Sequence, residues 1–393
     1  MEIKVVASTK ENYQATKDEF DSIAGHGAGV CYLAGTAEQL FAEPPEKTAR
    51  RVALIKDSGH HSPFDHSFIT LELVDIPKII AMALNNERDY TTNEKSARYT
   101  KMFLSDVAGD EQEYYNKWLD IFQKEIKEQC QKKSPLWFTD KRVLKLAQEN
   151  ARYLTSVFTP TTMLYTISYR QFNVLYSLFQ KEIKRLENTK DPFFARFRDE
   201  LQILTEKWST LPYVEKALLK NNKNRSLSLF RKESVKKYFG DVYSLAYKGS
   251  FAQYAQAHRH RTLTNNITML KKPEFYVPPI LKKKPELVEE WKKDCLALST
   301  NYPQGMLVMI SERGNFEDYL LKVNERNCAQ AQLEIDNQTT AITNEMYKAY
   351  KKQGDKEKVE ILEPHLKGSR CTAGYKCESP CGFRDGITGE RIV

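Results

Sequence analysis

The stretch FITLELVDIPKIIAMALNNERDYTTNEKSARY, residues 68–99, decides the fold of this chain. Its first part, 68–74, is rich in β-branched and aromatic residues, which predicts a strand. Pro77 follows, and because proline is tolerated in the first turn of a helix, the apolar run 78–86 is predicted to be helical. We therefore expect a strand, then an apolar helix, then the polar segment 86–99.

The polar segment carries an acceptor, a hydroxyl and a guanidinium at alternate positions, Glu94, Ser96 and Arg98. In an extended or turn-like backbone, alternate side chains point to the same side. Such a group could hold the phosphate and the sugar of a nucleotide together. A polar loop after a helix is the simpler interpretation, and these three residues alone favour it.

The order of elements in this first part recurs later in the chain. Helices are predicted at 111–131, 141–150 and 170–186, and a partly helical connector follows. From residue 242 an apolar helix to 260, a proline-rich loop, a helix at 286–298, an apolar segment after Pro303 and a helix from 315 to 347 are expected. The predicted fold class is α/β (α+β), with two tandem domains, each a small sheet flanked by long helices. The expected boundaries are 1–190, a connector at 191–240, and 241–393.

Composition and charge indicate a soluble globular chain. Hydrophobic residues make up 41% and charged residues 28% of the 393, without an apolar run of membrane-spanning length or an apolar signal core. A cytoplasmic protein is expected. The seven cysteines are an odd number, which favours reduced thiols over a disulfide framework. The net charge of +8 is dispersed among acidic residues, so nucleic-acid binding ranks last.

Two short segments contain five of the histidines. The run His258-Arg259-His260-Arg261 places four potential cations at the end of the predicted helix, where the helix dipole favours them, and it suits a phosphate or pyrophosphate. His60, His61 and His66 surround a Ser-Pro-Phe-Asp turn. Carboxylate spacing typical of zinc hydrolases is lacking there, so histidines satisfied by local hydrogen bonds are favoured over a metal site.

The segments GHHSPFDH (59–66) and TTNEKSARY (91–99) together resemble the flavin-dependent thymidylate synthases. That family has a Gly-His-x-Ser/Thr-Pro-Phe-Glu-His loop and then Arg-His-Arg-x-x-Ser-x-Asn-Glu-x-Ser-x-Arg-Tyr. In the first half of this chain, NER (86–88) stands where Arg-His-Arg is expected, Ser168 replaces an asparagine and Phe179 replaces a nucleotide-binding arginine.

The second half of the chain shows the opposite losses. It keeps Arg-His-Arg at 259–261 and matches the family's later stretch at 326–335, but Ile267, Met269 and Lys271 stand where Glu, Ser and Arg should follow. Ser299 replaces the arginine that the first half keeps as Arg152. In the resembled family each site is assembled across subunits of a homotetramer. Two complementary halves would thus rebuild one complete kind of site, and a homodimer of this chain would imitate the tetramer.

The resemblance implies reductive methylation of dUMP to dTMP with FAD as cofactor and NADPH and methylenetetrahydrofolate as co-substrates. It implies Arg326 as the catalytic residue that stabilises negative charge on the pyrimidine. The implied dUMP ligands are Glu94, Lys95, Ser96, Ala97, Arg98, Arg152, Gln256, Arg259 and Arg326. The implied FAD ligands are His60, Ser62, Glu94, Arg259, His260, Arg261 and Asn315, and no metal is expected.

Three alternatives stay open at this point. A related flavoenzyme could transfer a methyl or hydroxymethyl group to C5 of another uridylate. A non-catalytic paralogue could bind nucleotides or a partner, although random loss should not leave each half intact where the other fails. The tail with Cys371, Cys377 and Cys381 could be a zinc site, but its spacing departs from common zinc knuckles, and an ordered or reduced tail is favoured.

Overall fold

The computed structural model describes residues 1–9, 15–33, 36–95, 109–220, 225–371, 373–377, 381, 383 and 390–393. The chain forms two compact units. Unit 1 consists of Met1–Lys95 and Pro160–Ser228, and unit 2 of Ser96–Thr159 and Leu229–Val393. This division differs from the contiguous domains expected from the sequence, because two helices of the first half pack with the second half.

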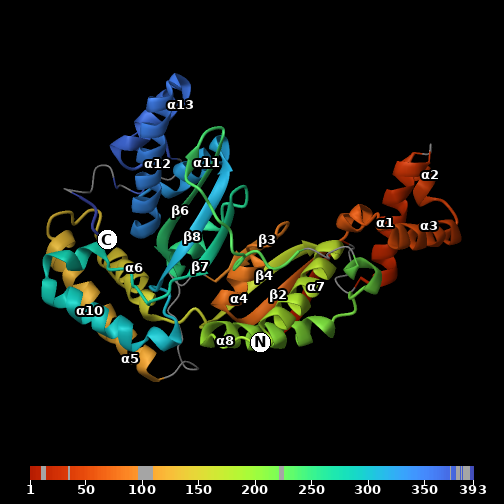
Figure 1. Ribbon diagram of the computed structural model, residues 1–393, viewed down its shortest axis with the longest axis horizontal. Coiled ribbons are helices and arrows are strands. Elements are labelled where there is room, and N and C mark those ends of the chain that lie inside the picture. Colours follow the sequence, from red (N-terminus) through yellow and green to blue (C-terminus); the bar gives the residue numbers. More distant parts are fainter. Residues whose placement is uncertain are drawn as a thin grey trace. The chain divides into compact units, whose positions relative to one another are not determined.

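Unit 1 contains a four-stranded antiparallel sheet with the order β1-β2-β4-β3 (Figure 1). Its strands are β1 (Glu2–Ser8), β2 (Phe68–Pro77), β3 (Thr91–Glu94) and β4 (Pro160–Ser168). In β2, alternate residues Ile69, Leu71 and Leu73 are buried, because successive side chains of a strand point to opposite faces. The predicted strand at 68–74 is confirmed, and so is the helix that begins after Pro77.

The helices of unit 1 include a long pair, α7 and α8, that packs side by side along the sheet (Figure 1). The predicted helix at 170–186 is α7, and Ser168 caps its N-terminus. The helical part of the expected connector is α8. The elements are α1 (Lys17–Tyr32), α2 (Ala37–Phe41), α3 (Pro45–Ser58), the 3-10 helix η1 (Ser62–His66), α4 (Lys78–Leu84), α7 (Tyr169–Leu186), α8 (Pro192–Ser209) and the 3-10 helix η4 (Lys216–Leu219).

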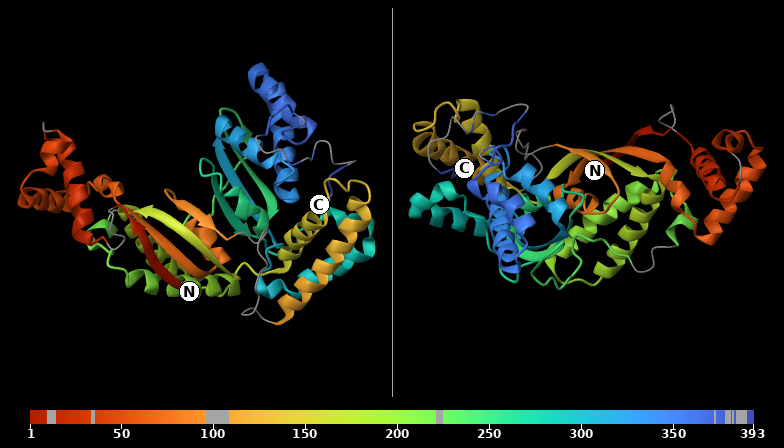
Figure 2. Two further views of the ribbon diagram at one scale, coloured as in Figure 1. Left: turned by 180° about the vertical axis from the view of Figure 1, so that it is seen from behind. Right: turned by 90° about the horizontal axis from the view of Figure 1, so that it is seen from above.

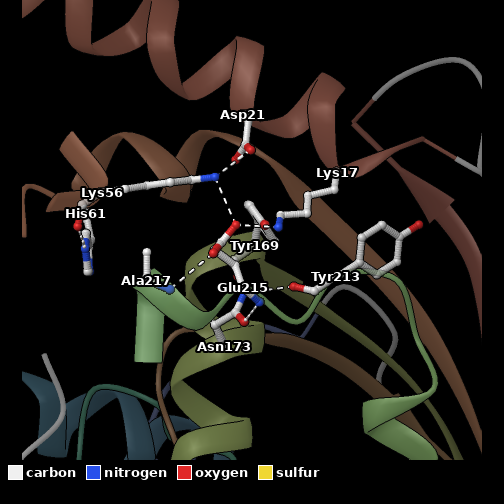
Figure 3. A network of polar contacts seen from close by, with 9 residues as sticks. All are labelled: Lys17, Asp21, Lys56, His61, Tyr169, Asn173, Tyr213, Glu215 and Ala217. Carbon is white, nitrogen blue, oxygen red and sulfur yellow. Dashed lines mark hydrogen bonds and ion pairs between the residues drawn. The ribbon is translucent and has the colours of Figure 1, made fainter. Parts of the chain in front are cut away.

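A network of charged groups ties α1 and α3 to the segment after α8 (Figure 3). The carboxylate of Glu215 pairs with Lys17 at 2.5 Å and with Lys56 at 2.9 Å, and Lys56 also pairs with Asp21 at 2.6 Å. His61 contacts the backbone oxygen of Lys56 through Nε2 at 3.3 Å. The network therefore supports the start of the turn that carries the predicted flavin ligands.

We expect Glu215→Gln to destabilise unit 1 at neutral pH by about 1–2 kcal/mol, because charged hydrogen bonds from two lysines are lost. Burial opposes ionisation of Glu215, but hydrogen bonds from Lys17 and Lys56 outweigh it and hold its pKa at about 2, below the usual 4.5. A lowered pKa stabilises the fold above the unfolded-state pKa, so the contribution is lost as the pH falls from about 4.5 to about 2.

Urea unfolding at several pH values measures this difference between the wild type and Glu215→Gln. The gap should be widest at pH 7 and should close toward pH 2. Glu206→Gln, at an exposed position of α8, is the matched control and should unfold like the wild type. A pH-independent gap would contradict the assignment.

Unit 2 repeats the sheet of unit 1, with the order β5-β6-β8-β7 and antiparallel pairing throughout. Its strands are β5 (Tyr238–Phe239), β6 (Val242–Ser250), β7 (Thr264–Met269) and β8 (Leu307–Asn315). In both units a short helix follows the second strand, α4 in unit 1 and α9 (Phe251–Ala257) in unit 2. A pair of helices likewise follows the last strand in each unit, so the shared order of elements is a shared topology.

The remaining helices of unit 2 form two groups, and Figure 2 gives two further views of them. One group is α11 (Phe316–Arg326), α12 (Leu333–Gln353), α13 (Lys356–Leu362) and the 3-10 helix η7 (Glu363–Lys367). The other is α5 (Gly109–Ile126), the π-helical turn η2 (Lys127–Gln131), α6 (Asp140–Ala151), the 3-10 helices η3 (Arg152–Leu154), η5 (Pro279–Lys283) and η6 (Ser299–Asn301), and α10 (Pro285–Ala297).

Aromatic packing explains why α5 and α6 belong to unit 2 rather than to the first half. Trp118 of α5 and Trp291 of α10 are fully buried and meet edge to face, with ring centroids 4.8 Å apart. The indole Nε1 of Trp118 also donates to Asp294 at 2.8 Å. Such aromatic pairs contribute about 0.5–1.5 kcal/mol beyond their burial. A domain boundary near residue 190, as expected from the sequence, would separate the helices that share this core.

Two expected helices of the second half are wrong as predicted. The segment 242–260 is not one helix, because β6 takes 242–250 with Tyr243, Leu245 and Tyr247 buried at alternate positions, and only α9 is helical. The helix expected from 315 to 347 is two helices, α11 and α12. Between them the chain turns at Cys328, whose carbonyl accepts from the amide of Ala331 at 2.8 Å.

Candidate functional site

The turn after α9 carries Arg259, His260 and Arg261, and unit 2 joins this turn to the end of α11. The Nε–H of Arg326 donates to Nε2 of His260 at 2.7 Å, and Nη2 of Arg326 donates to the carbonyl of Gln256 at 3.4 Å. His260 is buried, Arg259 is half-buried and Arg261 is exposed. The cations predicted from the two motifs of the second half therefore lie at one place in unit 2.

His260 must be neutral to accept this hydrogen bond, and its surroundings keep it so. Burial lowers its pKa first, and the charges of Arg326 and Lys322 lower it further, to about 2. The observed contact assigns the acceptor role to Nε2, so the proton of the neutral ring is on Nδ1. One N–H group of Arg326 is thus hydrogen-bonded to a neutral imidazole.

Gln332, at the start of α12, connects Arg152 to Gln256. Its Oε1 accepts a hydrogen bond from Nη2 of Arg152 and another from Nε2 of Gln256, while its Nε2 donates to the hydroxyl of Tyr153. Arg152 is 6% exposed and Gln332 is 2% exposed, so these bonds are shielded from water. Arg152 comes from the first half of the sequence, yet it lies beside Gln256 of the second half.

The buried carboxylate of Glu334 is hydrogen-bonded to Tyr153, and through it to Gln332. The hydroxyl of Tyr153 donates to Glu334 at 2.8 Å, and Ser250 donates to the same carboxylate from its backbone N at 2.8 Å and from its hydroxyl at 2.6 Å. Burial raises the pKa of Glu334. Because a buried donor or acceptor without a partner is costly, this chain of bonds restricts Gln332 to one orientation.

Gln256 has one acceptor that the protein does not use. Its Oε1 is buried and lacks a hydrogen-bond partner in the part of the chain that the structure describes. Because buried polar atoms are almost always hydrogen-bonded, an unused acceptor beside Arg152 and Arg326 indicates a position for a ligand N–H or O–H group.

The corresponding turn of unit 1 carries different side chains at its second and third positions, while Arg88 stands at the position of Arg261. The turns after α4 and α9 have the same length, so Asn86 and Glu87 occupy the positions of Arg259 and His260. Ser228 fills this turn: its N and its hydroxyl donate to Glu87 at 2.5 and 2.7 Å, and Nδ2 of Asn86 donates to its hydroxyl at 2.7 Å. In unit 2 His260 of this turn accepts a hydrogen bond from Arg326, whereas in unit 1 Glu87 of the turn accepts from Ser228.

The helix that follows the last strand shows the same difference. Ser168 caps α7 and Asn315 precedes α11, and counted from these residues Phe179 stands where Arg326 stands in unit 2. Phe179 is fully buried. Unit 1 therefore lacks the arginine and the histidine that hold each other in unit 2.

The other predicted ligands are distributed over both units. In unit 1, Glu94 ends β3 and pairs with Lys78 at 2.5 Å, while His60 and Ser62 lie at η1 after α3. Lys95 is exposed and its amide donates to Thr162 at 2.9 Å. Ser96, Ala97 and Arg98 lie outside the described residues.

Asn315 is exposed at the start of α11 and borders a hollow of about 640 Å³ in unit 2. Asp241, Glu317 and Glu357 also line this hollow. Lys358 lines it as well and pairs with Asp241 at 2.9 Å, so acidic groups still predominate and suit a phosphate poorly. The donor-rich region of unit 2 is therefore the turn after α9.

Two residues of this group, Gln332 and Tyr153, were not singled out from the sequence. A single amide or phenol has no spacing pattern of its own, so neither could be identified by periodicity. Gln332 does lie within the run 326–335 that resembles the family. It lies directly before an amphipathic helix and in the same run as Arg326, whose counterpart binds nucleotide in the family. This position is the signal from which Gln332 could have been predicted as a site residue.

The cysteine tail lies near the loop after α11. The amide of Arg370 donates to the carbonyl of Asn327 at 2.8 Å, which brings Cys371 close to Cys328. Burial raises the pKa of Cys371. Among the described residues, no group of three His, Cys, Asp or Glu side chains is arranged to hold a metal ion. Within the same ranges, every helix is too short or too polar to cross a membrane.

Comparison with known proteins agrees with the motifs. Residues 14–189 match the family described as thymidylate synthase complementing protein. The match covers the loop at 59–66 and the run at 91–99. Residues 190–393 lie beyond it, and their relation to the segment rests on the shared topology.

Similar solved structures include flavin-dependent thymidylate synthase ThyX from Helicobacter pylori, complexed with FAD and dUMP. It has 18% identity and a TM-score of 0.33, over 56% of this chain and 100% of that one. Another is the UMP/dUMP methylase PolB from Streptomyces cacaoi, with 16% identity and a TM-score of 0.32, over 53% of this chain and 87% of that one. No curated protein matches the chain.

Proposed function

We propose that this chain catalyses FAD-dependent reductive methylation of dUMP to dTMP with methylenetetrahydrofolate and NADPH. The observation that carries the proposal is the grouping in unit 2 of Arg152, Gln256 and Arg326. These residues come from three distant parts of the sequence, and each matches a nucleotide ligand of the resembled family. Hydrogen bonds through Gln332 and His260 orient all three.

Each of the three residues has a role suited to its chemistry. Arg152 supplies a fixed positive charge for the phosphate, since a guanidinium matches phosphate oxygens in two directions. Gln256 offers its unused Oε1 to an N–H or O–H donor of the ligand. Arg326 stabilises the negative charge that develops on the ring when N3 loses its proton and C5 becomes a nucleophile.

The donor set at the turn after α9 fits a flavin dinucleotide. Arg259 and Arg261 flank buried His260, and two guanidinium groups at one turn suit the pyrophosphate of FAD. We propose Arg259, His260 and Arg261 as flavin ligands, with His60, Ser62, Glu94 and Asn315 as the further ligands implied by the motifs. When bound, FAD accepts a hydride from NADPH and supplies it for reduction of the transferred one-carbon unit.

The halves of this chain are proposed to be tandem copies with complementary losses. The occupied turn at Glu87 and the buried Phe179 support one working kind of site and one that does not work. That Glu94, Ser96 and Arg98 serve the same nucleotide remains a proposal from the motifs alone. A homodimer that imitates the family's homotetramer follows from it.

The purified protein is expected to be yellow, to bleach when NADPH is added, and to form dTMP when dUMP and methylenetetrahydrofolate are present. Absorbance follows the flavin, and mass spectrometry identifies the product. The same assay with UMP separates the two uridylates, and a product with one additional oxygen would identify hydroxymethyl transfer. A colourless protein that takes up no FAD would refute the proposal.

A further inference from the structure

Arg391 lies against the segment of unit 2 that carries Gln332. Its Nη2 donates to the carbonyl of Ala331 at 2.7 Å, and its Nη1 pairs with the carboxylate of Asp336 at 3.1 Å. Its Nε donates to the carbonyl of Val393 at 2.9 Å, and Val393 is buried in the hydrophobic core of unit 2. One guanidinium therefore joins three acceptors from three different segments.

These contacts are shielded from water and carry charge. The side chain of Arg391 is 8% exposed, and that of Asp336 is 12% exposed. Burial raises the pKa of Asp336 to about 6, and the charge of Arg391 opposes this rise, so the carboxyl is ionised at pH 8. Hydrogen bonds between ionised partners are stronger than neutral ones. Arg391 is therefore held in one place, and it holds its partners in turn.

Two of the three contacts flank Gln332 along the chain. Ala331 directly precedes it, and Asp336 lies one helical turn after it, where its amide donates to the carbonyl of Gln332 at 3.1 Å. Gln332 is the N-cap residue of α12, but its side chain makes no capping bond within the described residues and contacts the site residues instead. The position of this amide therefore depends on the backbone around it, which Arg391 holds on both sides.

Unit 1 has a different structure at this place. Counted from the helix caps, residues 327–332 correspond to 180–185, which belong to the last turns of α7. In unit 2, helix α11 ends before this segment, so the carbonyl of Ala331 lies outside a helix. A buried carbonyl in such a position needs another donor, and Arg391 supplies it. The contact therefore belongs to the segment that distinguishes unit 2 from unit 1.

We propose that Arg391 is a positioning residue for the nucleotide site. By holding the chain on both sides of Gln332, it fixes the amide that orients Arg152 and Gln256. Arg326 is oriented by a different contact, the one with His260, so Arg391 acts on binding of the nucleotide rather than on the chemical step. The inference rests on the proposed function, since it takes Arg152 and Gln256 as ligands of dUMP.

The test is Arg391→Met in the enzyme with FAD bound, at pH 8. Calorimetry should show dUMP affinity about tenfold lower than in the wild type, which corresponds to about 1.4 kcal/mol. The KM for dUMP should rise by a similar factor while kcat and FAD content stay within about twofold, because a loss of binding shared by substrate and transition state raises KM alone.

A second variant covers the case in which the first does not fold. Arg391→Met leaves the buried carboxylate of Asp336 without this partner, so Arg391→Met together with Asp336→Asn removes that charge as well. Circular dichroism shows whether each variant folds. Arg313→Met is the matched control, because this arginine of unit 2 pairs with Glu233 at 2.9 Å, and it should leave dUMP affinity unchanged.

A readout independent of nucleotide is the side-chain amide of Gln332, followed by NMR of ¹⁵N-labelled protein and assigned with Gln332→Leu. Its resonance should shift in Arg391→Met and stay in place in Arg313→Met. Unchanged dUMP affinity in a folded variant would overturn the positioning role, and so would a loss of kcat and FAD in step with the affinity. If the wild type neither binds dUMP nor makes dTMP, yet the amide resonance shifts in Arg391→Met, the proposed function fails and the link between Arg391 and Gln332 stands.

Discussion

Arg326→Lys is expected to lower nucleotide methylation by about 10²–10³ in kcat while FAD stays bound, because the lost group is one that stabilises a developing anion. Lysine keeps the positive charge but has no Nε–H on a planar group. It cannot donate to His260 and present a second donor to the pyrimidine at the same time. The change removes orientation rather than charge, which makes it a sharp test of the proposed role.

Three measurements separate the possible outcomes of this substitution. Flavin absorbance reports FAD, mass spectrometry reports dTMP, and calorimetry reports dUMP binding. Arg313→Lys is the matched control, because this arginine lies on the neighbouring strand β8, is half exposed and pairs with Glu233 at 2.9 Å. Full activity in Arg326→Lys would contradict the assignment, and loss of flavin together with activity would indicate a structural role.

The motifs predict site residues, namely Arg326 as the catalytic residue and Arg152, Gln256 and Arg326 as dUMP ligands, but they do not predict the surroundings of these residues. Arg152, Gln256 and Arg326 were identified because each stands at a fixed place in a long motif. Their grouping in unit 2 could not be derived from spacing, since it depends on α6 packing with the second half. Trp118 and Trp291 decide that packing, and contacts between distant aromatic residues leave no periodic pattern in the sequence.

The errors in secondary structure have a local cause. The segment 242–260 contains Tyr243, Leu245 and Tyr247 at alternate positions, followed by alanines at helical spacing. A short apolar run does not distinguish a strand from a helix by periodicity alone. Ser250, which accepts from the amide of Gln253, marks the boundary, and serine at such a position is a helix-start signal that the reading of one long helix overlooked.

The turn at Asn86 and Glu87 in unit 1 is stabilised by contacts of its own. Glu87 in place of a neutral histidine adds a negative charge to the turn, and Ser228 donates two hydrogen bonds to that carboxylate. Restoring histidine there would leave Ser228 facing a different partner, so a single reversion should not rebuild a flavin site. The side chains that differ from unit 2 in this turn are therefore satisfied by local hydrogen bonds.

Gln332→Leu is expected to cost about 1–3 kcal/mol of stability, because the buried guanidinium of Arg152 loses one hydrogen-bond acceptor. Gln256 and Tyr153 lose a partner as well. In protein that remains folded, affinity for dUMP should fall by about 10², since a displacement of about 1 Å in a positioning group has effects of that size. FAD binding should change much less, because Gln332 does not contact the turn at 259–261 in the described hydrogen bonds.

Gln332→Glu makes the test independent of folding. It keeps an acceptor and gains a charge opposite Arg152, but it loses the Nε2–H that donates to Tyr153. For Gln332→Glu we expect a smaller loss of stability than for Gln332→Leu and an intermediate loss of dUMP affinity. Gln330→Leu, at an exposed position of the same loop, is the control and should behave like the wild type. Thermal unfolding and calorimetry check both expectations. If Gln332→Leu binds dUMP normally, Arg152 and Gln256 keep their orientation without the side chain of Gln332. The network through Gln332 is then structural rather than part of nucleotide recognition.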